Sequence, residues 1–206
     1  MSETGPAAAM SAPQRPAQMR VFFALWPDAA SAAALQARGR ELHAACGGRL
    51  MRRDTLHLTL AFVGEVPVAR LGALEAVAES VRGERFALEL DRVGSWHDHR
   101  IIWTGCAQVP LALQTLVQRL AAGLHAAGFT LEARAFKAHV TLVRKALRPP
   151  QRAETAPLRW QVASFVLVAS EHDATSTHYR TLGRWPLRAH EQQTTIPRTG
   201  VWNRAG

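Results

Sequence analysis

The chain has 206 residues, of which 48% are hydrophobic, and it carries a formal net charge of +9 at pH 7. This length and this apolar content suffice for one domain or a compact two-lobed unit with a buried core, and they exclude a fully disordered chain and a small disulfide-stapled scaffold. Nearly all the basic residues are arginine, which binds phosphate through paired hydrogen bonds. The charge therefore fits either a polyanionic partner such as RNA or an arginine-rich solvated surface.

Cys46 and Cys106 are the only cysteines, and neither belongs to a CxxC pair. They predict reduced thiols in a cytoplasmic protein, without a disulfide or a zinc site. No apolar run reaches the roughly 18 residues that a membrane helix needs, and residues 1–19 lack the apolar core of a signal peptide. We therefore expect a cytoplasmic protein that makes no use of a membrane.

Three segments are expected along the chain. Residues 1–19 are rich in Ala, Pro, Ser and Gln and predict a disordered N-terminal extension. The folded domain is expected to span residues 20–187, and residues 188–206 are expected to form a loose C-terminal tail.

Within the domain, apolar runs and period-two alternation predict strands, whereas apolar residues that recur every three or four positions predict helices. Proline and Asp28 at the start of the first helix, and glycines after each helix, mark the helix ends. In chain order the predicted elements are a strand at 21–26, a helix at 28–46, a strand at 57–63, a helix at 67–82, two strands at 86–90 and 100–103, a helix at 110–127, a strand at 139–142, and two strands at 165–168 and 179–182.

The most specific feature is a four-residue motif that occurs twice, His57-Leu58-Thr59-Leu60 and His139-Val140-Thr141-Leu142. Only about 0.03 matches are expected by chance in a chain of this composition. In a strand, each copy sends its His and Thr to one face and its apolar residues to the other. Each copy also follows a predicted helix. The repetition therefore predicts two similar lobes that each offer one His-Thr strand to a shared groove.

Two histidines that face one groove are suited to acid and base catalysis. Histidine has an unperturbed pKa of about 6.5, so one copy can be neutral while the other is protonated. The neutral histidine can deprotonate a nucleophile on one side of a phosphorus atom while the protonated one donates to the leaving oxygen on the other. Thr59 and Thr141 can donate to the non-bridging oxygens, and no metal is required. His57 and His139 are equivalent in sequence, so either can be the acid.

Other chemically capable residues have plainer interpretations. His97, Asp98 and His99 lie between two predicted strands and lack the further ligands of a metal site, so we expect them at a polar hairpin tip. Phe136 lies close to the second motif, where it can stack on a nucleobase or fill the core at a strand edge, and the core is the favoured interpretation. Three tryptophans in apolar surroundings are expected in the core: Trp26, Trp103 and Trp185.

The chain resembles the 2H phosphoesterases, and among them the bacterial RNA 2′,3′-cyclic phosphodiesterases, historically called 2′-5′ RNA ligases. Four segments carry the resemblance and cover nearly all of the folded chain: residues 20–27, 56–66, 136–144 and 179–187. The resemblance implies a bilobal α+β fold with pseudo-two-fold symmetry. Each lobe would be an antiparallel sheet with helices outside, and a central cleft would hold both motifs.

The same resemblance implies an activity and a role for each site residue. The activity is hydrolysis of RNA 2′,3′-cyclic phosphate ends to 2′-phosphates, without a metal or other cofactor. His57 resembles the general acid that protonates the leaving 3′ oxygen, and His139 resembles the base that activates water. Thr59 and Thr141 would hold the phosphate, and Arg144 would add positive charge at the cleft wall.

Ala138 is the one visible departure from the family, whose members often carry proline before the second histidine. The proline would stiffen the approach to the strand, so its absence loosens the placement of His139 and leaves the chemistry in place.

The expected partner is an RNA with a 2′,3′-cyclic phosphate end, with tRNA fragments and small cyclic nucleotides as candidates, and the expected state is a monomer. Two alternatives stay open. One is ligation or cleavage of 2′-5′ linkages in the same site, which can use the same two histidines. The other is a non-catalytic module that binds RNA ends, in keeping with the charge of +9. Because a module that only binds has no need for both histidines, their joint presence favours an enzyme.

Overall fold

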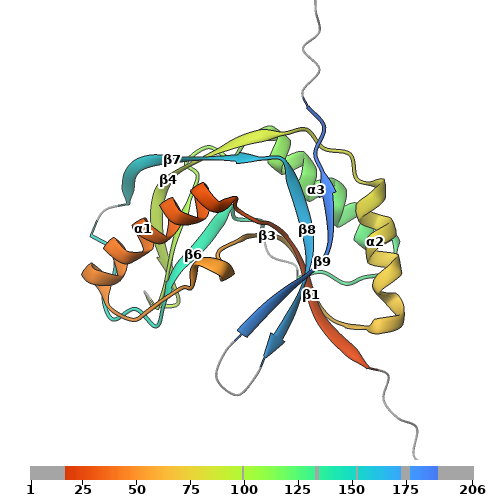
Figure 1. Cartoon of the computed structure of the whole chain (residues 1–206), viewed down its shortest axis with the longest axis horizontal. Coiled ribbons are helices and arrows are strands. Elements are labelled where there is room, and N and C mark those ends of the chain that lie inside the picture. The colour runs from red at the N-terminus through yellow and green to blue at the C-terminus, as the bar shows by residue number, and fades with distance from the viewer. Residues whose placement is uncertain (1–16, 99, 133–134, 152, 173–176, 190–206) are drawn as a thin grey trace, which may run out of the picture.

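The computed structural model describes residues 17–189 except 99, 133–134, 152 and 173–176. The described chain forms two antiparallel sheets, and Figure 1 shows helix α1 beside one sheet and helices α2 and α3 beside the other. One sheet has the strand order β3-β1-β8-β9, and the other has the order β2-β6-β5-β4-β7. The predicted bilobal α+β fold, with an antiparallel sheet in each lobe, is therefore confirmed.

The elements follow one another in this order: β1 (Gln18–Leu25), α1 (Ala29–Cys46), β2 (Arg49–Leu50), the 3₁₀ helix η1 (Arg53–Thr55), β3 (Leu58–Pro67), the 3₁₀ helix η2 (Val68–Arg70), α2 (Leu71–Ser80), β4 (Phe86–Trp96), β5 (Ile101–Gly105), α3 (Leu111–Ala126), β6 (His139–Arg144), β7 (Glu154–Val162), β8 (Ser164–His172) and β9 (Thr177–Pro186). The three predicted α-helices and the predicted strands are all present.

Both ends of the domain extend slightly beyond the expected limits of 20 and 187. Strand β1 begins at Gln18, because Gln18 and Met19 already pair with the end of β3. The backbone N–H of Arg188 donates to the carbonyl of Gly83, which holds the chain one residue past the expected end. Residues 1–16 and 190–206, where the extension and the tail are expected, lie outside the described residues.

Strand β7 is absent from the predicted elements, as is the two-residue β2. Leu158, Trp160 and Val162 are buried on one face of β7, with the period of two that a half-buried strand requires. Pro157 obscures this pattern, because proline cannot donate to a sheet and normally argues against a strand. Here β7 is an edge strand, where proline is tolerated.

The two lobes are interleaved in the sequence. The sheet that contains β1 and β3 is completed by β8 and β9, with Phe23 of β1 opposite Leu167 of β8. Helix α1 follows β1 in the chain but packs against β6 and β7 of the other sheet. One continuous hydrophobic core joins buried side chains of both lobes, among them Leu58 of β3 and Leu142 of β6. The chain therefore crosses repeatedly between the lobes, and the core couples them.

Arg38 fastens helix α1 to the sheet beneath it. Its guanidinium donates to the carbonyl of Leu90 at 2.6 Å, to the hydroxyl of Thr104 at 3.0 Å and to the carbonyl of Ala156 at 2.5 Å. The fully buried Thr104 hydroxyl in turn donates to the carbonyl of Arg92 at 2.9 Å. This network joins polar groups of three strands through a single side chain, and it satisfies those of the buried Leu90 and Thr104.

Candidate active site

The two His-Thr motifs meet in one cavity between the sheets. His57 immediately precedes β3, and His139 is the first residue of β6. Their side chains, together with Thr59 and Thr141, line a cavity of about 110 Å³. Strands β3 and β6 belong to different sheets and approach each other here. The structure thus brings both copies of the motif to a single point, as their alternation and repetition predict.

Each histidine ring is held by a carbonyl two residues earlier in the chain. Nδ1 of His57 lies 2.8 Å from the carbonyl oxygen of Thr55, and Nδ1 of His139 lies 2.7 Å from that of Lys137. A carbonyl oxygen only accepts, so Nδ1 carries the hydrogen in both rings. In the neutral imidazole, Nε2 is then left with a lone pair for proton transfer. The two copies repeat this arrangement, although one sheet has four strands and the other has five.

Aromatic rings surround His57 on several sides. Trp26 stacks on its ring with centroids 5.5 Å apart and planes 6° from parallel. The Phe22 ring lies 4.9 Å away, and the Tyr179 ring stands edge-on at 5.2 Å. Trp26 is half-buried and packs against a small cluster of buried residues around Phe22, in keeping with the expected core position, and its ring also forms a wall beside the histidine.

His139 has a corresponding aromatic wall on the other sheet. Trp96 stands edge-on to it with ring centroids 4.3 Å apart, and Trp103 lies at 6.5 Å. Trp103 is half-buried rather than a core residue, and its ring covers its cross-strand partner Gly94. A Cβ atom on Gly94 would lie 2.2 Å from the Trp103 ring, so only glycine fits there. The ring beside His139 therefore depends on a glycine in the neighbouring strand.

Burial and nearby positive charge keep both histidines neutral in the free protein at neutral pH. Burial lowers the pKa of His57 from 6.5 to about 4, against the hydrogen bond to Thr55 that raises it, and the charge of Arg144, together with that of His139 whenever this ring is protonated, lowers it as well. Burial also lowers the pKa of His139, assisted by Arg144 and Lys137. A phosphate between the rings has the opposite effect, because its negative charge favours the protonated imidazole.

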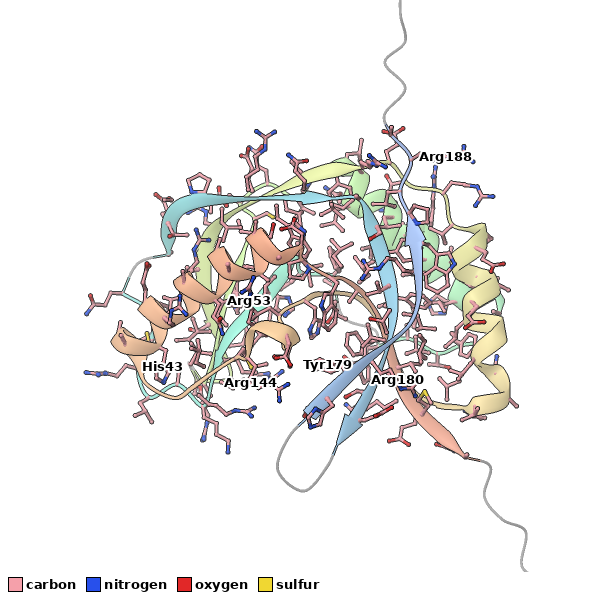
Figure 2. All side chains as sticks on the ribbon, in the orientation of Figure 1. His43, Arg53, Arg144, Tyr179, Arg180 and Arg188 are labelled. Atoms are coloured by element: carbon pink, nitrogen blue, oxygen red, sulfur yellow. The ribbon has the colours of Figure 1, made fainter. Side chains whose placement is uncertain are left out.

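Thr59, Thr141 and Arg144 present polar groups to the same cavity. Within the described part of the chain, neither threonine hydroxyl is engaged in a hydrogen bond to protein, and Arg144 forms no ion pair with a carboxylate. Figure 2 shows Arg144 of β6 and Tyr179 of β9 on the two sides of the space between the sheets. These groups are therefore available to an anionic ligand.

A family model described as LigT like phosphoesterase matches residues 25–103. An RNA 2′,3′-cyclic phosphodiesterase of Escherichia coli strain K12 is 37% identical over 145 residues, which cover 68% of this chain and 80% of the relative. The chain belongs to the LigT-like phosphoesterase family. Among solved structures, E. coli LigT complexed with 3′-AMP has a TM-score of 0.73 at 32% identity, covering 83% of this chain and 99% of that one. A protein of Thermus thermophilus has a TM-score of 0.69 at 26% identity, covering 84% and 100%.

This LigT-like site includes residues that the motifs do not reveal. Tyr179, the only tyrosine of the chain, lines the catalytic cavity, and Trp26 and Trp96 contact the two histidines. Tyr179 lies in a strand with a period-two pattern, which is the signal for a side chain on the cleft face, but the pattern does not say which sheet that strand joins. Burial raises the pKa of its phenol, so it stays protonated and can donate a hydrogen bond.

The remaining candidates lie outside the site. His97 and Asp98 form the turn between β4 and β5 with φ angles of 52° and 53°, as expected of a hairpin tip, and His99 lies outside the described residues. Phe136 packs against the hydrophobic core, as predicted, and so does Trp185. Within the described ranges, no three His, Cys, Asp or Glu side chains gather to hold a metal ion, and no helix is long and apolar enough to cross a membrane.

Proposed function

We propose that this protein hydrolyses 2′,3′-cyclic phosphate ends of RNA to 2′-phosphates by two-histidine acid and base catalysis that requires no metal. The observation that carries the proposal is that the imidazoles of His57 and His139, each held by a hydrogen bond to a backbone carbonyl, share one cavity of about 110 Å³ with two threonine hydroxyls. The names of the E. coli and Archaeoglobus fulgidus relatives, both RNA 2′,3′-cyclic phosphodiesterases, support the same reaction.

Substrate binding prepares the site for catalysis. The cyclic phosphate carries one negative charge, to which the hydroxyls of Thr59 and Thr141 and the guanidinium of Arg144 offer hydrogen bonds. That charge raises the low histidine pKa values, so that one imidazole takes up a proton while the other stays neutral. The bound anion thereby creates the acid and base pair that the free enzyme lacks at neutral pH.

The chemical step moves two protons and exchanges one P–O bond. Nε2 of His139 takes a proton from water as the water oxygen attacks phosphorus. The bond from phosphorus to the 3′ oxygen breaks, and the Nε2 proton of His57 moves to that oxygen. The product is a 2′-phosphomonoester with a free 3′ hydroxyl, and proton exchange with water restores the original protonation of the two rings.

The assignment of His57 as acid follows the family resemblance and has its own test. In a substrate with sulfur in place of the leaving 3′ oxygen, the thiolate leaves without being protonated. Loss of the acid then costs little, whereas loss of the base still costs the full effect. We expect His57→Ala to regain much of its rate on this substrate and His139→Ala to remain inactive. The reverse pattern would exchange the two roles.

The proposed reaction is tested with a short RNA that ends in a 2′,3′-cyclic phosphate, followed by identification of the product. A 2′-phosphate is expected, and His57→Ala and His139→Ala should each lower kcat by at least about a thousandfold. His125→Ala, on the exposed end of α3, is the matched control and should retain activity. EDTA should have no effect. A 3′-phosphate product, full activity in either active-site variant or loss of activity in EDTA contradicts the proposal.

The same experiment separates the rival functions. A new 2′-5′ linkage between two RNA pieces would indicate ligation, and tight binding of the cyclic end without any product would indicate a binding module. For the biological setting we propose a cytoplasmic monomer that acts on RNA ends such as tRNA fragments and also on small cyclic nucleotides. Cys46 and Cys106 are free thiols, in keeping with a reducing compartment. Sedimentation of the purified protein tests the monomer.

A further inference from the structure

The catalytic cavity opens into a larger one that the proposed chemistry does not use. This second cavity has a volume of about 660 Å³, compared with about 110 Å³ for the catalytic cavity. Six residues line both, so the two are continuous: Met51, Thr55, His57, Thr59, Arg144 and Tyr179. Cavities of this size hold ligands much larger than one phosphate. A molecule that places its cyclic phosphate between the histidines can therefore continue into the larger cavity.

The larger cavity is lined by arginine from both sheets and by no acidic side chain within the described part of the chain. The arginines are Arg20 of β1, Arg49 of β2, Arg144 of β6 and Arg52, which is paired with Asp54. Glu65, the cross-strand partner of Arg20, and Glu171 line a neighbouring depression that shares Arg20 and Ser170 with this cavity. Three of these arginines act electrostatically on the same group, because burial raises the pKa of the Tyr179 phenol and the positive charges of Arg144, Arg20 and Arg49 each lower it.

Arg49 and Arg144 are direct neighbours across the β2–β6 pair. Like charges opposite each other in an antiparallel pair repel and destabilise the sheet. In the described chain neither arginine has a carboxylate partner that would relieve this repulsion. Both side chains are exposed, so burial of their surface does little to offset this repulsion. An anionic ligand between the two guanidinium groups would remove the repulsion.

Arg20 faces this pair from the other sheet and is held in place by an aromatic ring. Its guanidinium carbon lies 4.9 Å from the centroid of the Phe62 ring, a cation–π contact that orients the side chain. Phe62 lines the same cavity. The larger cavity therefore has a basic group on each sheet.

We propose that Arg20 and Arg49, which lie beside the Arg144 that faces the cyclic phosphate, form a subsite for the phosphate on the 5′ side of the terminal nucleoside, so that the enzyme selects RNA ends over nucleoside 2′,3′-cyclic phosphates that lack this second phosphate. The inference rests on the proposed function, because the cyclic phosphate must occupy the catalytic cavity. Arginine suits this task because its planar guanidinium binds a phosphate through two parallel hydrogen bonds.

The test compares three substrates with the same base. They are a nucleoside 2′,3′-cyclic phosphate, the same compound with an additional 5′-phosphate, and a dinucleotide that ends in the 2′,3′-cyclic phosphate. The wild-type kcat/KM should be at least about tenfold higher for the two substrates that carry the 5′-side phosphate, because one charge-assisted hydrogen bond strengthens binding by about this factor. In Arg49→Gln and Arg20→Gln this ratio should fall several-fold, and Arg49→Lys should restore part of it. The ratio should also decrease with salt more steeply in the wild type than in Arg49→Gln.

Arg40→Gln is the matched control, since Arg40 is exposed on α1 and lines neither cavity. It removes the same charge and should leave the ratio unchanged. Equal kcat/KM for all three substrates in the wild type, or a wild-type ratio in Arg49→Gln, overturns the subsite. Failure of the wild type to hydrolyse any of the three overturns the proposed function instead, so the two outcomes are distinct.

Discussion

Protonation of His57 should make the folded protein less stable as the pH falls from 6.5 to about 4. The pKa of this histidine is lowered from 6.5 to about 4 by burial, so between these values the unfolded chain binds a proton that the folded chain does not. Stability then rises with pH in this window and is lost as the pH falls. A shift of this size corresponds to about 3 kcal/mol in total, and about 2 kcal/mol of it is already lost at pH 5.

The assay is urea unfolding at pH 7 and pH 5 at constant ionic strength, followed by the fluorescence of the six tryptophans. The wild type is compared with His57→Gln, which keeps a polar side chain but cannot titrate. On lowering the pH from 7 to 5, the free energy of unfolding of the wild type should fall by about 2 kcal/mol more than that of His57→Gln. In His125→Gln, where the lost histidine is exposed, the pH dependence of the wild type should persist. An equal pH dependence in the wild type and His57→Gln would refute the argument, whatever the absolute stabilities are.

Three further changes act on contacts described above. Trp26→Leu exposes His57 to water and raises its pKa, so a larger fraction of the free enzyme carries the protonated acid and kcat/KM above pH 6.5 should rise, as measured by initial rates between pH 4 and 8. Gly94→Ala places a Cβ atom 2.2 Å from the ring of Trp103. It should lower the free energy of unfolding in urea by about 1–3 kcal/mol and should also lower the activity. Arg38→Met breaks three hydrogen bonds and should lower the free energy of unfolding by about 2–3 kcal/mol, while activity per folded molecule is retained.

Two of these changes, Gly94→Ala and Arg38→Met, have a control in the same chain. Gly72→Ala, where an added Cβ meets nothing within 4 Å, should leave stability unchanged or slightly higher. Arg40→Met removes a charge from the exposed face of α1 and should be close to neutral. A pH profile that Trp26→Leu leaves in place, or equal stability losses for Gly94→Ala and Gly72→Ala, would contradict the contacts on which the predictions depend.

The sequence predicts the centre of the site well because the relevant information is local. The alternation in the two motifs sets which side chains share a face, and it does so without reference to the rest of the fold. Helix α1 is predictable for a similar reason: Asp28 caps its first turn by accepting from the Ser31 backbone N–H at 2.8 Å, and Gly47 ends it with a φ of 69°. Local chemistry of this kind is fully contained in a few neighbouring residues.

The parts that the sequence does not reveal depend on contacts between distant segments. Trp26 stacks on a histidine 31 positions later only because β1 and β3 pair in a particular register. Tyr179 reaches the same cavity because β9 joins the sheet of β1 through β8. The unrelieved neighbours Arg49 and Arg144 likewise become visible only when β2 is placed beside β6. A pattern along the chain identifies a face, but not what the fold places opposite it.

The interleaving of the two lobes has a consequence for how the enzyme folds. Strand β3, which carries one half of the site, lies at the edge of a sheet whose other members include the last two strands of the chain, β8 and β9. Pairing across such long sequence separations is slow, because the chain must close large loops first. No fragment that ends before β8 can complete that sheet. The two lobes are thus not separable modules, and activity should arise and disappear as one cooperative event that requires nearly the whole polypeptide.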